Sequence, residues 1–264
     1  MPYRLELRAV RDDAFDRLVE LGALDVDLDP DGTLAALMPD SVAPEEVAAA
    51  LGVNDITIHP ALGRDAESVW TLNPRAVRIG RLRIVPADAE AEPGALRLID
   101  AAAFGTGLHP TTALCLEALV DATQNGVPSG VLDVGTGSGV LALAALMLGV
   151  PQAVGIDVED EALRVAAENR RINGLDDRLQ LRRGGPDTLA GTWPLVVANV
   201  LAAPLMKMAP ALVRRVGHQG RLVLSGIPSA VQQDVEHAYR NLGMRLVRGT
   251  SRGGWVALVL DASW

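Results

Sequence analysis

The sequence is poor in cysteine and aromatic residues, and these shortages limit the kinds of site and of hydrophobic core that the protein can have. Cys115 is the single cysteine, which excludes an intramolecular disulfide and a metal site built from several cysteines. Aromatic residues make up only 3% of the chain, whereas 49% of it is hydrophobic. The core must therefore be built mostly from Leu, Val, Ala and Ile, a composition that suits an α/β protein.

Long apolar runs are also missing. The longest, such as residues 140–148 and 195–198, are far shorter than the roughly 20 residues that a bilayer span needs. The first residues alternate apolar and charged side chains and lack the apolar stretch of a signal peptide. We therefore expect a cytoplasmic protein without a membrane-spanning helix, in which Cys115 is a buried thiol.

Negative charge is concentrated at one end of the chain. The net charge is -9; residues 1–66 contain 14 Asp and Glu against 5 Arg, and residues 67–264 contain 19 of each sign. An acidic module repels a phosphate backbone and attracts a cationic partner. The charge thus favours a basic protein ligand over direct nucleic-acid binding, although the same acids could simply keep the surface soluble.

The pattern of elements predicts two domains. At 264 residues the chain has room for one large domain and a small one. Residues 1–62 have the order strand, helix, strand, strand, helix, strand, which predicts a small α+β ferredoxin-like domain. Residues 63–94 are interrupted by three prolines and are interpreted as a connector.

Residues 95–264 alternate predicted strands with predicted helices, which indicates α/β architecture with a doubly wound parallel sheet. The last two predicted strands, around 244–248 and 255–260, have only a Gly-rich turn between them. Since this turn is too short for a helical crossover, we expect the two strands to pair as a hairpin.

The strongest local signal is the segment Asp133-Val134-Gly135-Thr136-Gly137-Ser138-Gly139, between an apolar strand and an apolar helix. Its glycines allow close backbone approach to a ligand, and N–H groups at the helix start can face an anion. The third glycine comes one position too early for a dinucleotide fingerprint, and Val140 follows it. The spacing therefore disfavours the pyrophosphate of a dinucleotide and favours the carboxylate of S-adenosylmethionine as the bound anion.

Asp157 ends the next predicted strand, 22 residues after Gly135. An acid at this place can accept hydrogen bonds from both ribose hydroxyls of a bound nucleoside. Alone it could equally cap a helix, but together with the glycine-rich loop it predicts a site for S-adenosylmethionine.

Two further segments indicate the kind of enzyme. Phe104-Gly105-Thr106-Gly107-Leu108-His109-Pro110-Thr111-Thr112 precedes a helix, and Asn199-Val200-Leu201-Ala202-Ala203-Pro204-Leu205 leaves the fourth predicted strand of the sheet. With the two preceding motifs and a C-terminal Gly254–Val256 strand, the sequence resembles the PrmA-type ribosomal protein methyltransferases, which modify ribosomal protein L11 of the large subunit. The resemblance covers nearly the whole chain.

The resemblance implies a seven-stranded, Rossmann-like class I methyltransferase sheet over residues 95–264 and substrate recognition by residues 1–62. It also implies cofactor contacts, at Phe104, Thr112, Gly135, Gly137, Asp157 and Asn199. A basic ribosomal protein would be the substrate, modified on lysine or N-terminal amines. The N-terminal and connector segments match the family in pattern more than in letters.

Several of these residues have other interpretations. Thr111 or Thr112 could cap the helix that follows, and His109 could be a turn histidine rather than a catalytic one. Asn199 could have the purely structural role of stabilising a turn, but the side-chain carbonyl of a strand-end asparagine could also accept a hydrogen bond from an amine. We interpret Asn199 and His109 as the candidate catalytic residues and expect no metal.

Two alternative functions stay open at this point. The enzyme could methylate another protein, a small molecule or a nucleic acid, although Asn199 is not followed by the Asn-Pro-Pro-aromatic sequence of exocyclic-amine methyltransferases. The chain could also bind the cofactor without catalysis. Oligomeric state has no signature in the sequence.

Overall fold

The computed structural model describes residues 3–7, 14–23, 25–28, 34–53, 56–60, 76–87, 89, 93–99, 109–124 and 126–264. The chain divides into two compact units, Met1–Pro74 and Arg75–Trp264. Phe104 and the rest of its segment up to residue 108 lie outside the described residues, so its predicted cofactor contact stays a prediction.

The first unit has the expected element order. Its elements are β1 (Tyr3–Leu7), α1 (Ala14–Glu20), β2 (Asp25–Leu28), β3 (Leu34–Met38), α2 (Pro44–Leu51) and β4 (Thr57–Pro60). The strands pair in the order β2-β3-β1-β4, all antiparallel. Alternate residues of β1, Leu5 and Leu7, join Leu18 of α1 and Val47 of α2 in one core. The ferredoxin-like prediction is confirmed.

The second unit is built on a seven-stranded sheet in the order β10-β9-β8-β11-β12-β14-β13. Its strands are β8 (Val131–Val134), β9 (Ala153–Asp157), β10 (Leu179–Arg183), β11 (Trp193–Asn199), β12 (Val216–Pro228), β13 (Met244–Arg252) and β14 (Trp255–Ala262). The five strands β8 to β12 are mutually parallel, and β14 runs antiparallel to both β12 and β13. The predicted parallel sheet and closing hairpin are both confirmed.

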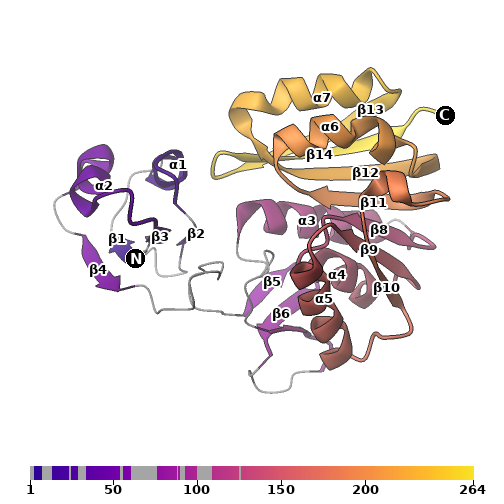
Figure 1. Ribbon diagram of the computed structural model, residues 1–264, viewed down its shortest axis with the longest axis horizontal. Coiled ribbons are helices and arrows are strands. Elements are labelled where there is room, and N and C mark those ends of the chain that lie inside the picture. Colours follow the sequence, from indigo (N-terminus) through magenta and orange to yellow (C-terminus); the bar gives the residue numbers. More distant parts are fainter. Residues whose placement is uncertain are drawn as a thin grey trace. The chain divides into compact units, whose positions relative to one another are not determined.

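Helices cover both faces of this sheet (Figure 1). They are α3 (Pro110–Gln124), α4 (Val140–Met147), α5 (Asp160–Ile172), α6 (Ala202–Val213) and α7 (Gln232–Arg240). Leu195 and Val197 of β11 pack in the cluster with α3 and α4, whereas Val196 and Ala198 pack in the cluster with α6 and α7. Because side chains alternate along a strand, a strand segment buried on both faces must be apolar throughout, as residues 195–198 of β11 are.

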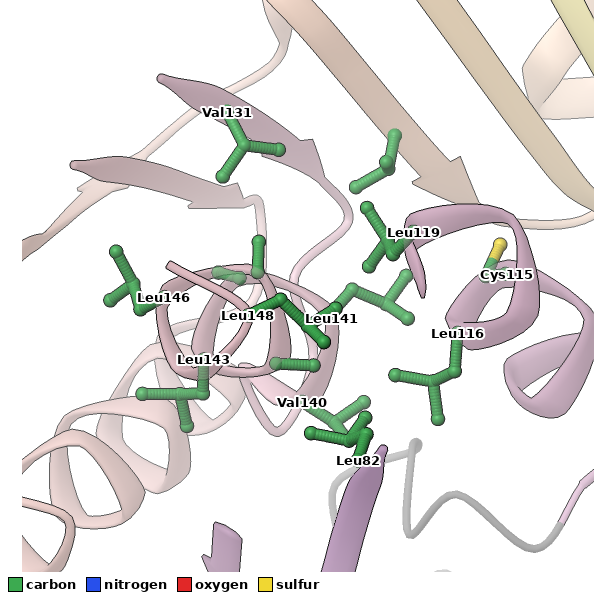
Figure 2. Close-up of a cluster of buried hydrophobic side chains, with 14 of the residues drawn as sticks. Leu82, Cys115, Leu116, Leu119, Val131, Val140, Leu141, Leu143, Leu146 and Leu148 are labelled. Carbon is green, nitrogen blue, oxygen red and sulfur yellow. The ribbon is translucent and has the colours of Figure 1, made fainter. Parts of the chain in front are cut away.

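A smaller sheet packs against α3 and α4. It comprises β5 (Val77–Ile79), β6 (Leu82–Pro86) and β7 (Leu96–Leu98), with β5 and β6 antiparallel and β6 and β7 parallel. Leu82 of β6 lies in the same buried cluster as Leu116 of α3 and Val140 of α4 (Figure 2). Cys115, in this cluster, is fully buried as expected, and burial raises the pKa of its thiol.

Strand β13 forms one margin of the large sheet and is lined with arginines. Arg248 pairs with Asp121 of α3 at 2.7 Å, and Arg252 pairs with Glu117 of α3 at 2.8 Å. These ion pairs tie the last strands of the chain to the helix that begins at Pro110. Among the described residues, no helix combines the length and hydropathy needed to cross a membrane.

Candidate functional site

The predicted site residues follow neighbouring parallel strands at one edge of the large sheet. Val134 pairs with Ile156 on one side and with Ala198 on the other, so Gly135, Asp157 and Asn199 all come at carboxyl ends of adjacent strands. Open α/β sheets bind ligands at this edge, where the strand order reverses. Here it reverses around β8, which lies between β9 and β11.

The loop between β8 and α4 winds tightly through three left-handed glycines. Gly135, Gly137 and Gly139 have φ values of 71°, 53° and 81°. The N–H groups of Gly135 and Thr136 both donate to the Ile156 carbonyl at 2.9 Å, and that of Gly139 donates to the Thr136 carbonyl at 2.8 Å. These amides are engaged by β9 and by the loop itself, so an anion at the start of α4 has to be held by other N–H groups.

Asp157 is fixed by two backbone donors. Its Oδ2 accepts the Gly137 N–H at 2.9 Å, and its Oδ1 accepts the N–H of Glu159, the N-cap of α5, at 3.1 Å. The N-cap of α5 is Glu159, so the alternative that Asp157 caps this helix does not hold. A carboxylate has about four acceptor positions, so an oriented Asp157 can still accept hydrogen bonds from hydroxyl groups.

Asp133 is a site residue that sequence reasoning did not single out. It is fully buried beneath the loop, where its Oδ2 accepts the Thr136 hydroxyl at 2.8 Å and the Ala142 N–H at 3.1 Å. Its Oδ1 has no hydrogen-bond partner in the described part of the chain. Burial raises the pKa of Asp133 to about 7. Its position two residues before the first glycine of the loop was the available signal.

Asn199 and Thr112 meet although 87 positions separate them in the sequence. The Asn199 Nδ2 donates to the Thr112 Oγ1 at 3.2 Å, and Thr112 is completely buried in the first turn of α3. Thr112 is thus not the cap of this helix. Because the amide nitrogen is engaged, the Asn199 carbonyl is the group available to an amine donor.

His109 caps α3 and contacts Trp255, which begins β14 and pairs with Pro228 at the carboxyl end of β12. Its Nδ1 accepts the Thr111 N–H at 3.3 Å and lies 2.8 Å from the Thr111 hydroxyl oxygen. Its ring meets the Trp255 ring edge-on, with centroids 5.4 Å apart. Burial lowers the pKa of His109 to about 4, so the imidazole is neutral at physiological pH and, with Nδ1 accepting, carries its proton on Nε2.

Val200, next to Asn199, is wedged between two glycines from distant segments. A Cβ on Gly135 would lie 2.5 Å from the Val200 Cγ1, and a Cβ on Gly226 would lie 2.4 Å from the Val200 carbonyl oxygen. Both glycines also have positive φ, 71° and 83°. Only glycine fits at either position, and the contact joins the glycine-rich loop to the strand end that carries Asn199.

The site therefore has two parts. We name the parts after the roles proposed for them: the cofactor half comprises Asp133, the loop Gly135–Gly139 and Asp157, and the acceptor half comprises His109, Thr112, Asn199 and Trp255. The contact between Gly135 and Val200 links them. Trp255 and Gly226 were missed as site residues because their proximity depends on the order of β12 and β14 in the sheet.

Comparison with known proteins identifies a family. The model of the family described as ribosomal protein L11 methyltransferase (PrmA) matches residues 27–263. A ribosomal protein L11 methyltransferase from Pelobacter propionicus is 40% identical over 204 residues, which is 74% of this chain and 66% of that protein, just under two thirds of its length. One from Myxococcus xanthus is 40% identical over 224 residues, 83% of this chain and 76% of that protein.

A solved structure agrees. The crystal structure of ribosomal protein L11 methylase from Lactobacillus delbrueckii subsp. bulgaricus superposes with a TM-score of 0.66 at 29% identity, covering 72% of this chain and 100% of that one. The chain belongs to the ribosomal protein L11 methyltransferase (PrmA) family, whose methyl donor is S-adenosylmethionine.

Proposed function

We propose that this protein transfers methyl groups from S-adenosylmethionine to amines of ribosomal protein L11, on lysine side chains, the N-terminus or both. The observation that carries the proposal is the placement of the Asn199 amide. Its Nδ2 is engaged by Thr112 at 3.2 Å, and the adjoining Val200 packs against Gly135 of the cofactor loop. An acceptor for an amine N–H thus lies beside the loop expected to hold the methyl donor.

The residues present fit S-adenosylmethionine. Asp157 is a carboxylate oriented by the Gly137 and Glu159 amides, which suits two ribose hydroxyls. Gly135 and Gly137 provide backbone without a Cβ at the adjoining loop. Thr112 and Asn199 lie in the acceptor half, next to this loop. When bound, the cofactor supplies a methyl group on a positively charged sulfur.

The protein's own task is to position a neutral amine. With the cofactor bound, the methyl group would pass from sulfur to the amine lone pair, and the methylated ammonium would then release a proton to solvent. Holding the amine in line behind the methyl group supplies most of the rate enhancement. Lysine has an ordinary pKa of about 10.4, and a nearby cationic sulfur favours its neutral form.

Asn199 can orient the amine through its carbonyl. His109 is the second candidate, and we propose that it lines the site as a neutral ring. Its pKa of about 4 makes it a poor acceptor for the proton of an alkylammonium group, so its role is to shape the acceptor half together with Trp255.

We also propose that the first unit recruits the substrate. Residues 1–66 carry 14 acids against 5 arginines, and this charge complements a basic ribosomal protein. Recruitment of this kind predicts that association slows as salt is raised, because long-range attraction is screened beyond about 10 Å at 0.1 M ionic strength.

The test is to incubate the protein with methyl-labelled S-adenosylmethionine and the separated proteins of the large ribosomal subunit. Label in ribosomal protein L11, recovered on lysine or the N-terminus, supports the proposal. Label in another protein, a small molecule or RNA assigns a different substrate to the same chemistry. Cofactor binding without label in any fraction would identify a non-catalytic binding protein.

A further inference from the structure

Two asparagines, one on α5 and one at its C-cap, connect this helix to elements outside the seven-stranded sheet. Asn169 and Asn173 are one helical turn apart, so they lie on the same side of the helix. Asn169 Oδ1 accepts the Ile99 N–H at 2.8 Å. Asn173 Oδ1 accepts the Arg97 N–H at 2.9 Å, and its Nδ2 donates to the Arg97 carbonyl at 2.7 Å. Both asparagines thus hold strand β7 and the residue after it.

Asn169 makes one bond that Asn173 does not. Its Nδ2 donates to the Ser138 carbonyl in the glycine-rich loop at 2.9 Å, and its side chain is fully buried. The second bond of the Asn173 Nδ2, at 2.7 Å, goes to the Asn169 carbonyl within the helix. Of the two asparagines, Asn169 alone hydrogen-bonds both the residue that follows β7 and the cofactor half.

This bond fixes one particular peptide group. The Ser138 carbonyl and the Gly139 N–H belong to the same planar unit and point in opposite directions. Asn169 holds the carbonyl, and the Thr136 carbonyl accepts the N–H at 2.8 Å. Ala166, one turn before Asn169, is so near that its Cβ would lie 3.2 Å from a Cβ on Gly139. Helix α5 thus determines how the loop enters α4.

We propose that Asn169 is a positioning residue for the cofactor loop: it holds the Ser138–Gly139 peptide in the orientation that S-adenosylmethionine binding requires. The inference rests on the proposed cofactor site. Asparagine suits the position because one side chain both accepts from Ile99 and donates to Ser138. An ionised aspartate would keep the first bond and place a negative charge against the Ser138 carbonyl.

The test compares N169D with N173D, because each keeps the oxygen that accepts a backbone N–H and loses its amide donor, to Ser138 in N169D and to Arg97 in N173D. We expect N169D to bind S-adenosylmethionine about tenfold or more weakly than N173D, since an unmet buried acceptor weakens binding by that order. The KM for the cofactor should rise while kcat at saturating cofactor changes little. Calorimetry and steady-state kinetics give these values, and thermal unfolding of both variants reports any general loss of stability.

Equal affinities in the two variants, or wild-type affinity in N169D, would overturn the inference. If N169D does not fold, N169S and N173S replace the pair. The serine hydroxyl has one oxygen in place of the two polar atoms of the amide, so it cannot reach both partners of the asparagine. Failure of the wild-type protein to bind S-adenosylmethionine would refute the proposed function itself. Binding by the wild type with no difference within the pair refutes only the role of Asn169.

Discussion

The cofactor half and the acceptor half of the site are built differently. In the cofactor half, two successive strand ends within 25 residues of one another are held by several bonds from backbone N–H groups, such as those from Gly137 and Glu159 to the Asp157 carboxylate. In the acceptor half, residues from three distant segments meet through one side-chain bond, between Asn199 and Thr112, and one ring contact, between His109 and Trp255. The cofactor half is thus set by local chain geometry, and the acceptor half depends on the whole sheet.

The largest expected effect is at Asp157. D157A removes the proposed ribose acceptor and leaves the Gly137 and Glu159 amides without their partner. We expect S-adenosylmethionine affinity to fall by about hundredfold or more, to the limit of detection in calorimetry. D160A is the control, since Asp160 is an exposed acid three positions later that pairs with Arg183. Undiminished cofactor affinity in D157A would contradict the assignment of the cofactor half.

The next effect is at the contact between the halves. In G135A the new Cβ would meet Val200 at 2.5 Å with φ at 71°. We expect both cofactor affinity and kcat to fall, with a loss of unfolding free energy of about 1–3 kcal/mol. G174A is the matched control, because Gly174 has φ 64° with nothing within 4 Å. If the two variants behave alike in calorimetry, kinetics and thermal unfolding, backbone strain alone explains the result and the halves are not coupled through Val200.

A smaller effect, confined to the acceptor half, is expected for Asn199. N199A removes the carbonyl proposed to orient the amine, so kcat should fall by about tenfold to a hundredfold, the range of a lost positioning hydrogen bond. The affinity for S-adenosylmethionine should change less than kcat. T112V, which removes only the acceptor of the Asn199 amide at 3.2 Å, should shift kcat in the same direction by less. A cofactor affinity that falls as much as kcat would make Asn199 chiefly a cofactor ligand.

The smallest effect concerns the buried carboxyl beneath the loop. Burial raises the pKa of Asp133 from 3.8 to about 7, so the folded protein retains a proton that the unfolded chain releases above about pH 4. The contribution of Asp133 to the free energy of unfolding therefore falls as pH rises from about 4 to 7. D133N cannot ionise and keeps an acceptor for Thr136 and Ala142.

Its Tm, relative to wild type, should accordingly rise between about pH 4 and pH 7, measured by thermal unfolding in matched buffers. D160N, at an exposed carboxyl of the same edge, controls for removal of charge. A constant difference between D133N and wild type across this range would show that Asp133 has no raised pKa.

The sequence predicted the cofactor half better than the acceptor half for a physical reason. Strands β8 and β9, the glycine-rich loop and Asp157 are local patterns of apolar residues, glycines and a strand-end acid, and they were placed to within a residue or two. The closing hairpin followed from the short turn between β13 and β14. These features depend on backbone preferences and side-chain alternation, which are written into neighbouring residues.

Contacts between distant segments could not be read in the same way. Asn169 lies in a helix rich in charged residues, where a polar side chain usually faces solvent, yet it is fully buried. In the sequence, Gly226 appears as a glycine that interrupts an apolar strand. The need for glycine there follows from the residue after β11, Val200, whose carbonyl lies against Gly226. The role of His109 as a helix cap likewise depends on where α3 begins.

The arginines along β13 have a consequence for how molecules of this protein meet one another. An unpaired strand margin is a template on which a second chain can add a strand and start aggregation. Long cationic side chains anchored to Asp121 and Glu117 would have to be displaced before foreign backbone could dock there. Concentrated salt weakens such anchors, so the protein should be most prone to self-association through this margin at high ionic strength.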